Sequence, residues 1–263
     1  MKNQTYHFVT PEGTVRGLYA HMMKQTHLLV AGASGSGKSV LVNGLLTAGL
    51  YDMPVDVEGG KQFILIDPKR VELAPYRNLP HCLGYASEPE EMVAMLRYAV
   101  RITEARYKVM EKQGLLKYRG SDIYVIIEEL ADLMTTNRRA VQPLIQRLCQ
   151  IARAARVHVV AVTQCPIVKV IPTEIKVNFD GIVALRTRSA QDCRNIIGVT
   201  GAEHFPQYGE CLYYSPEFMN TYQYSVPMVT DEEKYGLINF WLMQYRRPEE
   251  RKGLFTRMFR RTK

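Results

Sequence analysis

Short apolar runs, separated by polar and glycine-rich segments, recur along this chain. The clearest are His27–Ala31, Gln62–Ile66, Ile123–Ile127, Val157–Val162 and Gly181–Leu185. Continuous apolar runs of this length, without alternating polar positions, are typical of parallel strands that are covered on both faces. The pattern therefore predicts an α/β fold in which a mostly parallel central sheet is flanked by helices.

Apolar residues at helical spacing predict longer elements between and after these runs. The predicted helices are Lys38–Leu50, Glu90–Gln113, Asn137–Arg156 and Asp231–Tyr245. The inward face of the second helix is predicted to consist of Met92, Met95, Leu96, Ala99, Ile102, Ala105, Arg106 and Val109. We expect an irregular segment from Val71 to Ser87, which contains two prolines, and a short strand at Cys211–Tyr214.

These elements divide the chain into three parts. Residues 1–26 are predicted to form an N-terminal arm with an edge hairpin, since a strand-like Tyr6–Val9 is followed by the turn signal Pro11–Gly13. Residues 27–245 form the central domain. Residues 246–263 form a tail with eight basic and two acidic side chains. The tail could contact nucleic acid, or it could contact an acidic lipid surface and a membrane-associated transfer partner. It could equally be a solvated end, and the sequence leaves these alternatives open.

Composition narrows the class of protein. The 263 residues carry a net charge of +8, which favours a polyanionic partner without specifying one. No apolar run approaches membrane-spanning length, and the N-terminus lacks a basic-then-apolar signal pattern. The five cysteines show no zinc-ligand spacing. We therefore expect a cytoplasmic protein with reduced, mostly structural thiols.

The stretch Leu28–Ser39 combines an apolar strand, a loop of glycine and serine, and the start of a helix. It contains the pattern G-x-x-x-x-G-K-S from Gly32 to Ser39. Glycines allow the backbone to wrap a phosphate chain, and the N-terminal end of the next helix adds positive charge. Lys38 would contact the β- and γ-phosphates, and the Ser39 hydroxyl would hold Mg²⁺. The residues predicted to bind the nucleotide are Ala33, Ser34, Gly35, Ser36, Gly37, Lys38, Ser39 and Val40.

Polar side chains follow three of the predicted strands, at the edge where parallel sheets bind ligands. Asp67–Arg70 follows the second run, Glu128 and Glu129 follow the third, and Gln164 follows the fourth. Beside a phosphate-binding loop, Glu128 would hold Mg²⁺ and Glu129 would orient or deprotonate the attacking water. The plainer interpretation of this acidic pair is a solvated helix start. Gln164, at the end of the fourth run, is placed to sense a γ-phosphate.

The order of these motifs resembles the motor domain of the FtsK/SpoIIIE DNA translocases, which are RecA-like, additional-strand P-loop ATPases. The matching stretches cover about residues 15–216 and are His27–Ser39, Ile66–Lys69, Arg106–Met110, Glu129–Met134, Arg153–His158, Thr163–Pro166, Gly201–Glu203 and Gly209–Glu210. The resemblance implies a homo-hexameric ring that hydrolyses ATP and pumps double-stranded DNA through its pore. It assigns nucleotide and Mg²⁺ contacts to Lys38 and Ser39, the catalytic carboxylate to Glu129 and the polar sensor to Gln164. Arg153 is the candidate for reaching a neighbouring subunit's nucleotide, against the alternative of an ordinary surface charge.

The sequence departs from the family pattern in several places. Glu128 stands where the family usually has Asp, and Cys165 stands where it commonly has Arg. The family's membrane-spanning portion and its winged-helix domain are also missing from this sequence. We therefore expect a stand-alone motor from a mobile element, plasmid or phage, with DNA transfer as one role. The alternatives are an ATPase module of a protein secretion system and a nucleotide-binding scaffold that hydrolyses slowly because of Glu128.

Overall fold

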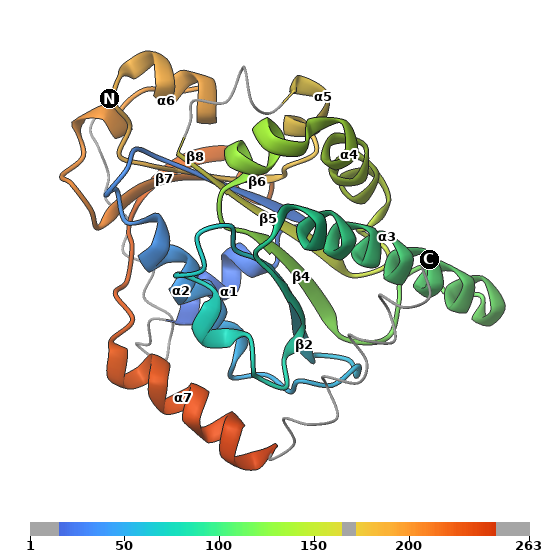
Figure 1. Ribbon diagram of the computed structural model, residues 1–263. Coiled ribbons are helices and arrows are strands. Elements are labelled where there is room, and N and C mark those ends of the chain that lie inside the picture. Colours follow the sequence, from blue (N-terminus) through green and yellow to red (C-terminus); the bar gives the residue numbers. More distant parts are fainter. Residues whose placement is uncertain (1–15, 165–171, 246–263) are drawn as a thin grey trace.

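A computed structural model describes residues 16–164 and 172–245, which build an eight-stranded sheet with helices on both faces (Figure 1). The strands are β1 (His27–Ala31), β2 (Lys61–Ile66), β3 (Cys82–Ala86), β4 (Asp122–Ile127), β5 (Val157–Thr163), β6 (Gly181–Leu185), β7 (Glu210–Ser215) and β8 (Asn220–Ser225). Their order across the sheet is β3-β2-β4-β5-β1-β6-β7-β8. Strands β1 to β6 are parallel, while β7 pairs antiparallel with β6 and β8. The predicted mostly parallel α/β sheet is confirmed.

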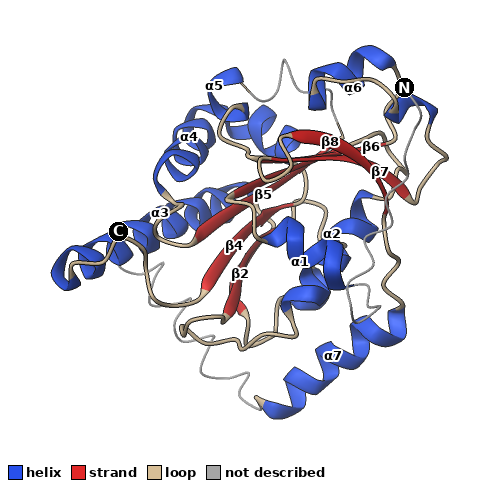
Figure 2. Cartoon of the chain, turned by 180° about the vertical axis from the view of Figure 1, so that it is seen from behind, coloured by secondary structure: helices blue, strands red, loops and turns tan. Residues whose placement is uncertain are grey.

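Alternate residues of each strand pack against helices on opposite faces, which gives three layers. Leu29 and Ala31 of β1 belong to the core beneath α3 (Pro89–Gln113), α4 (Leu130–Ile151) and α6 (Ala190–Ile197). Leu28 and Val30 belong to the core beneath α1 (Arg16–Met23), α2 (Lys38–Gly49) and α7 (Asp231–Gln244). Figure 2 shows the two helical layers from behind. Burial on both faces explains why the strands read as continuous apolar runs.

Several elements of the described part were not predicted. Strand β3 lies in the segment expected to be irregular, where it adds to the outer edge of β2. The other elements that were not predicted are β8, α1, α6 and the short elements η1 (Ala74–Tyr76), α5 (Thr173–Lys176) and η3 (Ala202–His204). Helix α1 falls within the predicted N-terminal arm, but its Tyr19 is fully buried against α2, so residues 16–23 pack as part of the domain. A Cβ on Gly44 of α2 would lie 2.1 Å from Tyr19 Cζ, and this close approach requires glycine there.

Helix α4 differs most from its prediction. It begins at Leu130, bends at Asn137, where φ is −143° and ψ is 38°, and ends at Ile151. The predicted helix began at this bend and continued to Arg156. The observed helix stops earlier because the chain turns there: the Val157 N–H donates to the Ala152 carbonyl, and Arg156 takes a left-handed conformation with φ 57°. Arg153 therefore lies in a turn and not on a helix.

Some predictions concern residues outside the described part. These are the hairpin at Tyr6–Gly13, Cys165 and the tail 246–263. Of the remaining cysteines, Cys149, Cys193 and Cys211 are buried free thiols, as predicted. In residues 16–164 and 172–245, none of the helices combines the length and the apolar character needed to cross a membrane.

Candidate nucleotide-binding site

The phosphate loop, defined here as Gly32–Ser39, lies over the carboxyl end of β1 and is shaped by its glycines. Gly35 has φ 72° and Gly37 has φ 94°, conformations that residues with side chains rarely adopt. Gly32 is required by space, since a Cβ there would lie 2.6 Å from Ser36 Oγ and 2.9 Å from Leu185 Cβ. Glycine at these positions allows the chain to fold into a tight loop between β1 and α2.

Helix α2 starts from this loop without a side-chain cap. Gly37 is the N-cap residue, and no side chain accepts a hydrogen bond from the first turn. The N–H groups of Lys38, Ser39 and Val40 have no acceptor within the helix, and together with the helix dipole they give this end a partial positive charge. Phosphate is a ligand that suits such a helix end. Backbone donors are therefore available at Lys38, Ser39 and Val40, which lie within the stretch that the sequence predicts to bind nucleotide.

Lys38 covers the phosphate loop from its helix end and is only 7% exposed. Its Nζ donates to the carbonyl oxygens of Gly32 at 2.9 Å and Ala33 at 2.7 Å. Burial lowers the pKa of Lys38 to about 8, and the nearby Glu129 carboxylate opposes that shift. The ammonium thus stabilises the loop by bonding its carbonyl groups, and these are contacts that a phosphate oxygen can replace.

Two buried carboxylates lie beside the loop, at the carboxyl end of β4. Strand β5 separates β4 from β1 in the sheet. Glu128 and Glu129 are each 6% exposed. Glu129 Oε1 accepts a hydrogen bond of 3.2 Å from the Gln164 N–H, which ties this carboxylate to the end of β5. Lys69, after β2, places its Nζ 3.7 Å from Glu128 Oε2 and 3.6 Å from Glu129 Oε2. The fold therefore brings Lys38, Glu128, Glu129 and Gln164 to one edge of the sheet.

The environment of Glu128 suits a bound cation. Burial raises the pKa of Glu128 to about 7, and while the Lys69 ammonium opposes this shift, the carboxylates of Glu129 and Asp67 add to it. Glu128 Oε2 is a buried oxygen without a hydrogen-bond donor among the described residues. Such an oxygen next to a second carboxylate is stabilised by positive charge. Mg²⁺ in nucleotide sites takes one or two protein oxygens together with phosphates and water, so Ser39 and Glu128 fit this ion.

Arg153 lies at the opposite edge of the sheet. It is exposed in the turn between α4 and β5, where the parallel strands begin. β1 has five residues, and at about 3.3 Å per residue they separate the two edges by roughly 16 Å. Of the residues assigned to catalysis from the sequence, Arg153 is the one that the fold keeps away from its own phosphate loop.

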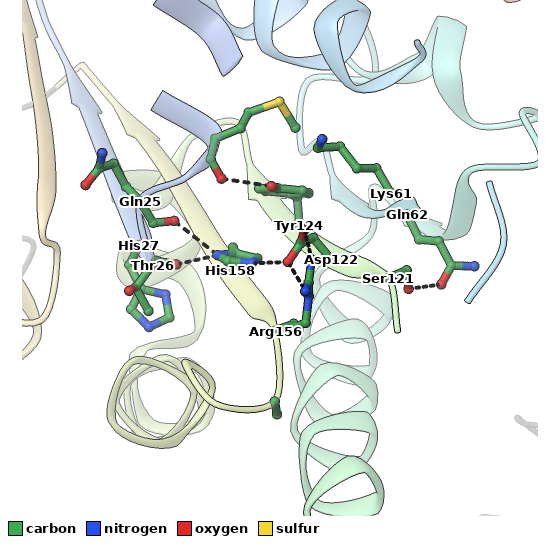
Figure 3. Close-up of polar contacts among 12 residues, drawn as sticks. Gln25, Thr26, His27, Lys61, Gln62, Ser121, Asp122, Tyr124, Arg156 and His158 are labelled. Carbon is green, nitrogen blue, oxygen red and sulfur yellow. Dashed lines mark hydrogen bonds and ion pairs between the residues drawn. The ribbon is translucent and has the colours of Figure 1, made fainter. Parts of the chain in front are cut away.

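Figure 3 shows how the turn that carries Arg153 is anchored. Arg156 donates two hydrogen bonds to Asp122, from Nε at 2.9 Å and from Nη2 at 2.6 Å. His158 Nε2 lies 3.0 Å from Asp122 Oδ1. These hydrogen bonds to Arg156 and His158 lower the pKa of Asp122 to about 2, against the effect of burial. The ion pair holds Arg156 in its left-handed conformation at the end of the turn.

Arg106 anchors the same turn from α3. It was predicted on the inward face of its helix, and it is 5% exposed. Its Nη1 donates to the carbonyl oxygens of Ala155 at 2.9 Å and Arg156 at 3.2 Å, and its Nη2 donates to Asp56 Oδ1 at 3.0 Å. Because a buried guanidinium needs many acceptors, these contacts satisfy Arg106 and fix the backbone next to Arg153.

Two contributors to the edge that holds the phosphate loop were not predicted from the sequence. Lys69 belongs to a charged stretch that was predicted to lie at this edge, but its position between the two carboxylates was not. The contact between the loop Phe205–Gly209 and the phosphate loop was not predicted either. A Cβ on Gly37 would lie 3.5 Å from Tyr208 Cβ, and one on Gly35 would lie 3.4 Å from Gln207 Nε2. This proximity depends on the pairing of β6 with β7, which local sequence patterns do not reveal.

Comparison with known sequences gives a consistent family match. The model of the FtsK/SpoIIIE family matches residues 8–122 and 118–168. The DNA translocase FtsK of Chlorobaculum tepidum is 37% identical over 234 residues, an alignment that covers 81% of this chain and 29% of that relative. The chain spans about a third of the length of the curated relatives it matches.

Solved structures share the fold at lower identity. The pCW3 conjugation coupling protein TcpA, in a monomer form with ATPγS, has a TM-score of 0.72 and 23% identity, covering 85% of this chain and 66% of that one. The cytoplasmic domain of the Type VII secretion ATPase EccC of Thermomonospora curvata has a TM-score of 0.68 and 18% identity, covering 82% of this chain and 28% of that one. These similarities show the fold alone, which is that of RecA-like P-loop ATPases.

Proposed function

Because this chain belongs to the FtsK/SpoIIIE family, we propose that it is the ATP-hydrolysing motor of a double-stranded DNA translocase. One observation carries the proposal. The phosphate loop at the end of β1 lies beside the buried pair Glu128 and Glu129 of β4, with β5 between the two strands. This arrangement places phosphate donors and a candidate catalytic base at one edge of the sheet.

Nucleotide binding begins with the phosphate loop. The uncapped N–H groups at the start of α2, those of Lys38, Ser39 and Val40, donate to the phosphates, and Lys38 exchanges the carbonyl oxygens of Gly32 and Ala33 for phosphate oxygens. Ser39 and Glu128 would hold Mg²⁺ together with the phosphates. The ion neutralises charge on the β- and γ-phosphates when it is bound.

Hydrolysis then depends on Glu129. Its carboxylate accepts the proton of the water that attacks the γ-phosphate, and the Gln164 N–H orients it through the 3.2 Å hydrogen bond to Oε1. The exposed Gln164 side chain, at the end of β5, contacts the γ-phosphate and distinguishes ATP from ADP. Lys69 neutralises the two glutamates until the nucleotide and its cation arrive.

The location of Arg153 supports assembly into a ring. An exposed arginine at the amino edge of the sheet reaches a nucleotide only if a second subunit offers its carboxyl edge. Such a head-to-tail contact joins two different surfaces, and repeated contacts of this kind close into a ring when the rotation allows. We propose a homo-hexamer in which Arg153 stabilises charge on the neighbouring subunit's γ-phosphate during hydrolysis.

DNA is the proposed substrate of the motor, supported by the family and by the net charge of +8. The test is ATPase activity with and without duplex DNA. We expect duplex DNA to stimulate hydrolysis and the stimulation to fall steeply between about 50 and 200 mM salt, since phosphate contacts release counterions. Equal rates of ATP hydrolysis with and without duplex DNA at low salt would contradict the proposal.

The same assay separates the alternatives. A protein-moving ATPase needs no stimulation by DNA, and the shared fold of EccC does not distinguish the two classes. A slowly hydrolysing scaffold would bind ATP but show little turnover with or without DNA. The membrane-associated transfer partner considered for the tail has no support from the described residues, since residues 246–263 lie outside them.

A further inference from the structure

Tyr208 lies against the phosphate loop, on the side away from the catalytic carboxylates. A Cβ on Gly37 would lie 3.5 Å from Tyr208 Cβ and 4.0 Å from Tyr208 Cα. Gly37 is the N-cap residue of α2, next to Lys38. Tyr208 therefore borders the phosphate loop at the residue that precedes Lys38.

The backbone of the loop Phe205–Gly209, which carries Tyr208, is anchored at both ends. Phe205 is 9% exposed and belongs to the core beneath α3, α4 and α6. At the other end, the Gly209 carbonyl accepts a hydrogen bond of 2.9 Å from the Val226 N–H. The preceding η3 is joined to the end of β6 by the Thr187 N–H, which donates to the Ala202 carbonyl at 3.2 Å. This anchoring keeps the loop beside α2.

The direction of the nucleotide follows from the order of the strands. β4, which carries Glu129, lies on one side of β1, while β6 and β7 lie on the other. The γ-phosphate must be near Glu129 and Lys38 for hydrolysis, which places it on the β4 side. The nucleoside end of a bound ATP then extends toward β6 and β7, where the loop Phe205–Gly209 is found.

The ring of Tyr208 is available to a ligand. Tyr208 is 69% exposed, and among the described residues its side chain has no hydrogen-bond or ring partner. An exposed aromatic ring beside a nucleotide's phosphates is suited to stacking on a base, because every base presents a π-face. We propose that Tyr208 is the stacking platform for the base of the bound nucleotide, an inference that rests on the proposed nucleotide binding at the phosphate loop.

The test is equilibrium binding of Mg·ATP, Mg·GTP and Mg·tripolyphosphate to the full chain and to variants at position 208. Tripolyphosphate has the phosphates but no base. We expect Tyr208→Ala to weaken binding of both ATP and GTP about 5- to 100-fold, since stacking depends little on base identity, and to leave tripolyphosphate binding unchanged. Tyr208→Phe retains the ring and should bind both nucleotides within about twofold of the wild type. Tyr235→Ala, at an exposed tyrosine of α7, is the matched control and should change nothing.

The outcomes separate this inference from the proposed function. If the unmodified chain binds neither ATP nor tripolyphosphate, the proposed nucleotide site fails and the platform fails with it. If the unmodified chain binds ATP but Tyr208→Ala binds it equally well, the platform alone is wrong. A loss of tripolyphosphate binding in Tyr208→Ala that matches its loss of ATP binding would also overturn the inference, because the defect would then lie in the phosphate loop. Thermal unfolding of each variant checks that the fold is intact.

Discussion

Arg156 and Asp122 form a two-point ion pair at the amino edge of the sheet, with Nε 2.9 Å from Oδ1 and Nη2 2.6 Å from Oδ2 (Figure 3). The two side chains are 15% and 18% exposed. Arg156 holds φ 57°, a conformation that costs a residue with a Cβ about 1–2 kcal/mol. The pair therefore stabilises an unfavourable backbone conformation, and that conformation shapes the turn that presents Arg153.

The two roles of Arg156 can be separated by comparing Arg156→Ala with Arg156→Gly. Both variants lose the ion pair, and we expect Arg156→Ala to lose about 2 kcal/mol of unfolding free energy, less than for a fully buried pair because His158 still contacts Asp122. Arg156→Gly should be about 1 kcal/mol more stable than Arg156→Ala, since glycine adopts positive φ without strain. Urea denaturation measures the difference. Equal stabilities would mean that the left-handed conformation does not persist without the pair.

The buried His27 should make the folded state less stable at acidic pH. This residue is 1% exposed, and its Nδ1 accepts a hydrogen bond of 3.0 Å from the Val159 N–H. Burial, together with nearby His158, lowers the pKa of His27 from 6.5 to about 4. His27 thus becomes protonated near pH 6.5 in the unfolded chain but only near pH 4 in the folded chain. The contribution of His27 is complete above pH 6.5 and is lost as the pH falls toward 4.

We expect His27 to account for about 2 kcal/mol of lost stability between pH 7 and pH 5. His27→Asn is the matched variant, because its side-chain oxygen keeps an acceptor for the Val159 N–H but does not titrate. Urea denaturation at both pH values should show a smaller pH effect in His27→Asn than in the unmodified chain. The same loss in both proteins would contradict this assignment.

The parts of the fold that sequence patterns predicted are those whose signal is local. Continuous burial on both faces makes β1, β2, β4, β5 and β6 apolar throughout, and all of them were predicted within one residue of their observed ends. The phosphate loop was predictable because its glycines must occupy fixed positions relative to Lys38. The pair Glu128 and Glu129 was predictable because it directly follows an apolar strand.

The parts that the sequence did not predict depend on contacts between distant segments. Strand β3 forms because Cys82–Ala86 adds to the edge of β2, and β8 is an edge strand of partly exposed residues with a weak apolar signal. Lys69 reaches Glu128 and Glu129 only because β2 and β4 are neighbours in the sheet. Tyr208 reaches Gly37 only through the position of β7. No spacing rule within a short window contains this information.

Lys38 and Glu129 should separate binding from turnover. Lys38→Ala removes the charged donor to the phosphates, and we expect nucleotide affinity to fall at least about tenfold. Glu129→Gln keeps the shape and the contact to the Gln164 N–H but removes the base. It should bind ATP normally and turn over about 10²- to 10⁴-fold more slowly. Binding titrations and ATPase assays measure both effects, with Asp132→Asn, at an exposed residue of α4, as the control. Wild-type turnover in Glu129→Gln would show that another group is the base.

Glu128 should limit the rate at this site. Its carboxylate extends one methylene further than the aspartate usual in the family, and its Oε2 is buried without a donor among the described residues. We expect Glu128→Asp to raise ATPase turnover by up to about tenfold, since small displacements of a metal-holding group have large effects on rate. ATPase rates over a range of Mg²⁺ concentrations, with Asp132→Glu as the control, test this. Unchanged or lower turnover in a folded variant would show that the site is adapted to the longer side chain.

Arg153 should act on a neighbouring subunit, because roughly 16 Å of sheet separates it from its own phosphate loop. Arg153→Ala subunits and Glu129→Gln subunits should each be inactive alone. In an equal mixture that assembles at random, about a quarter of the junctions pair an intact Glu129 on one subunit with an intact Arg153 on the next. ATPase activity of the mixture should therefore recover to a measurable fraction of the wild-type rate. Arg147→Ala, at another exposed arginine near this edge, is the control and should be active alone.

The mixing experiment is decisive because the two variants have complementary defects at different edges of the sheet. If Arg153 acted within its own chain, every subunit of the mixture would still carry one defective site, and no mixing ratio would restore activity. The recovered activity should be greatest near equal amounts of the two variants and should vanish toward either pure component. No recovery at any ratio, with co-assembly verified by sedimentation, would remove Arg153 from the proposed role and with it the argument for sites shared between subunits. Recovery would support a shared site, and the Arg156–Asp122 pair would then have a positioning role, since it anchors the turn that carries Arg153.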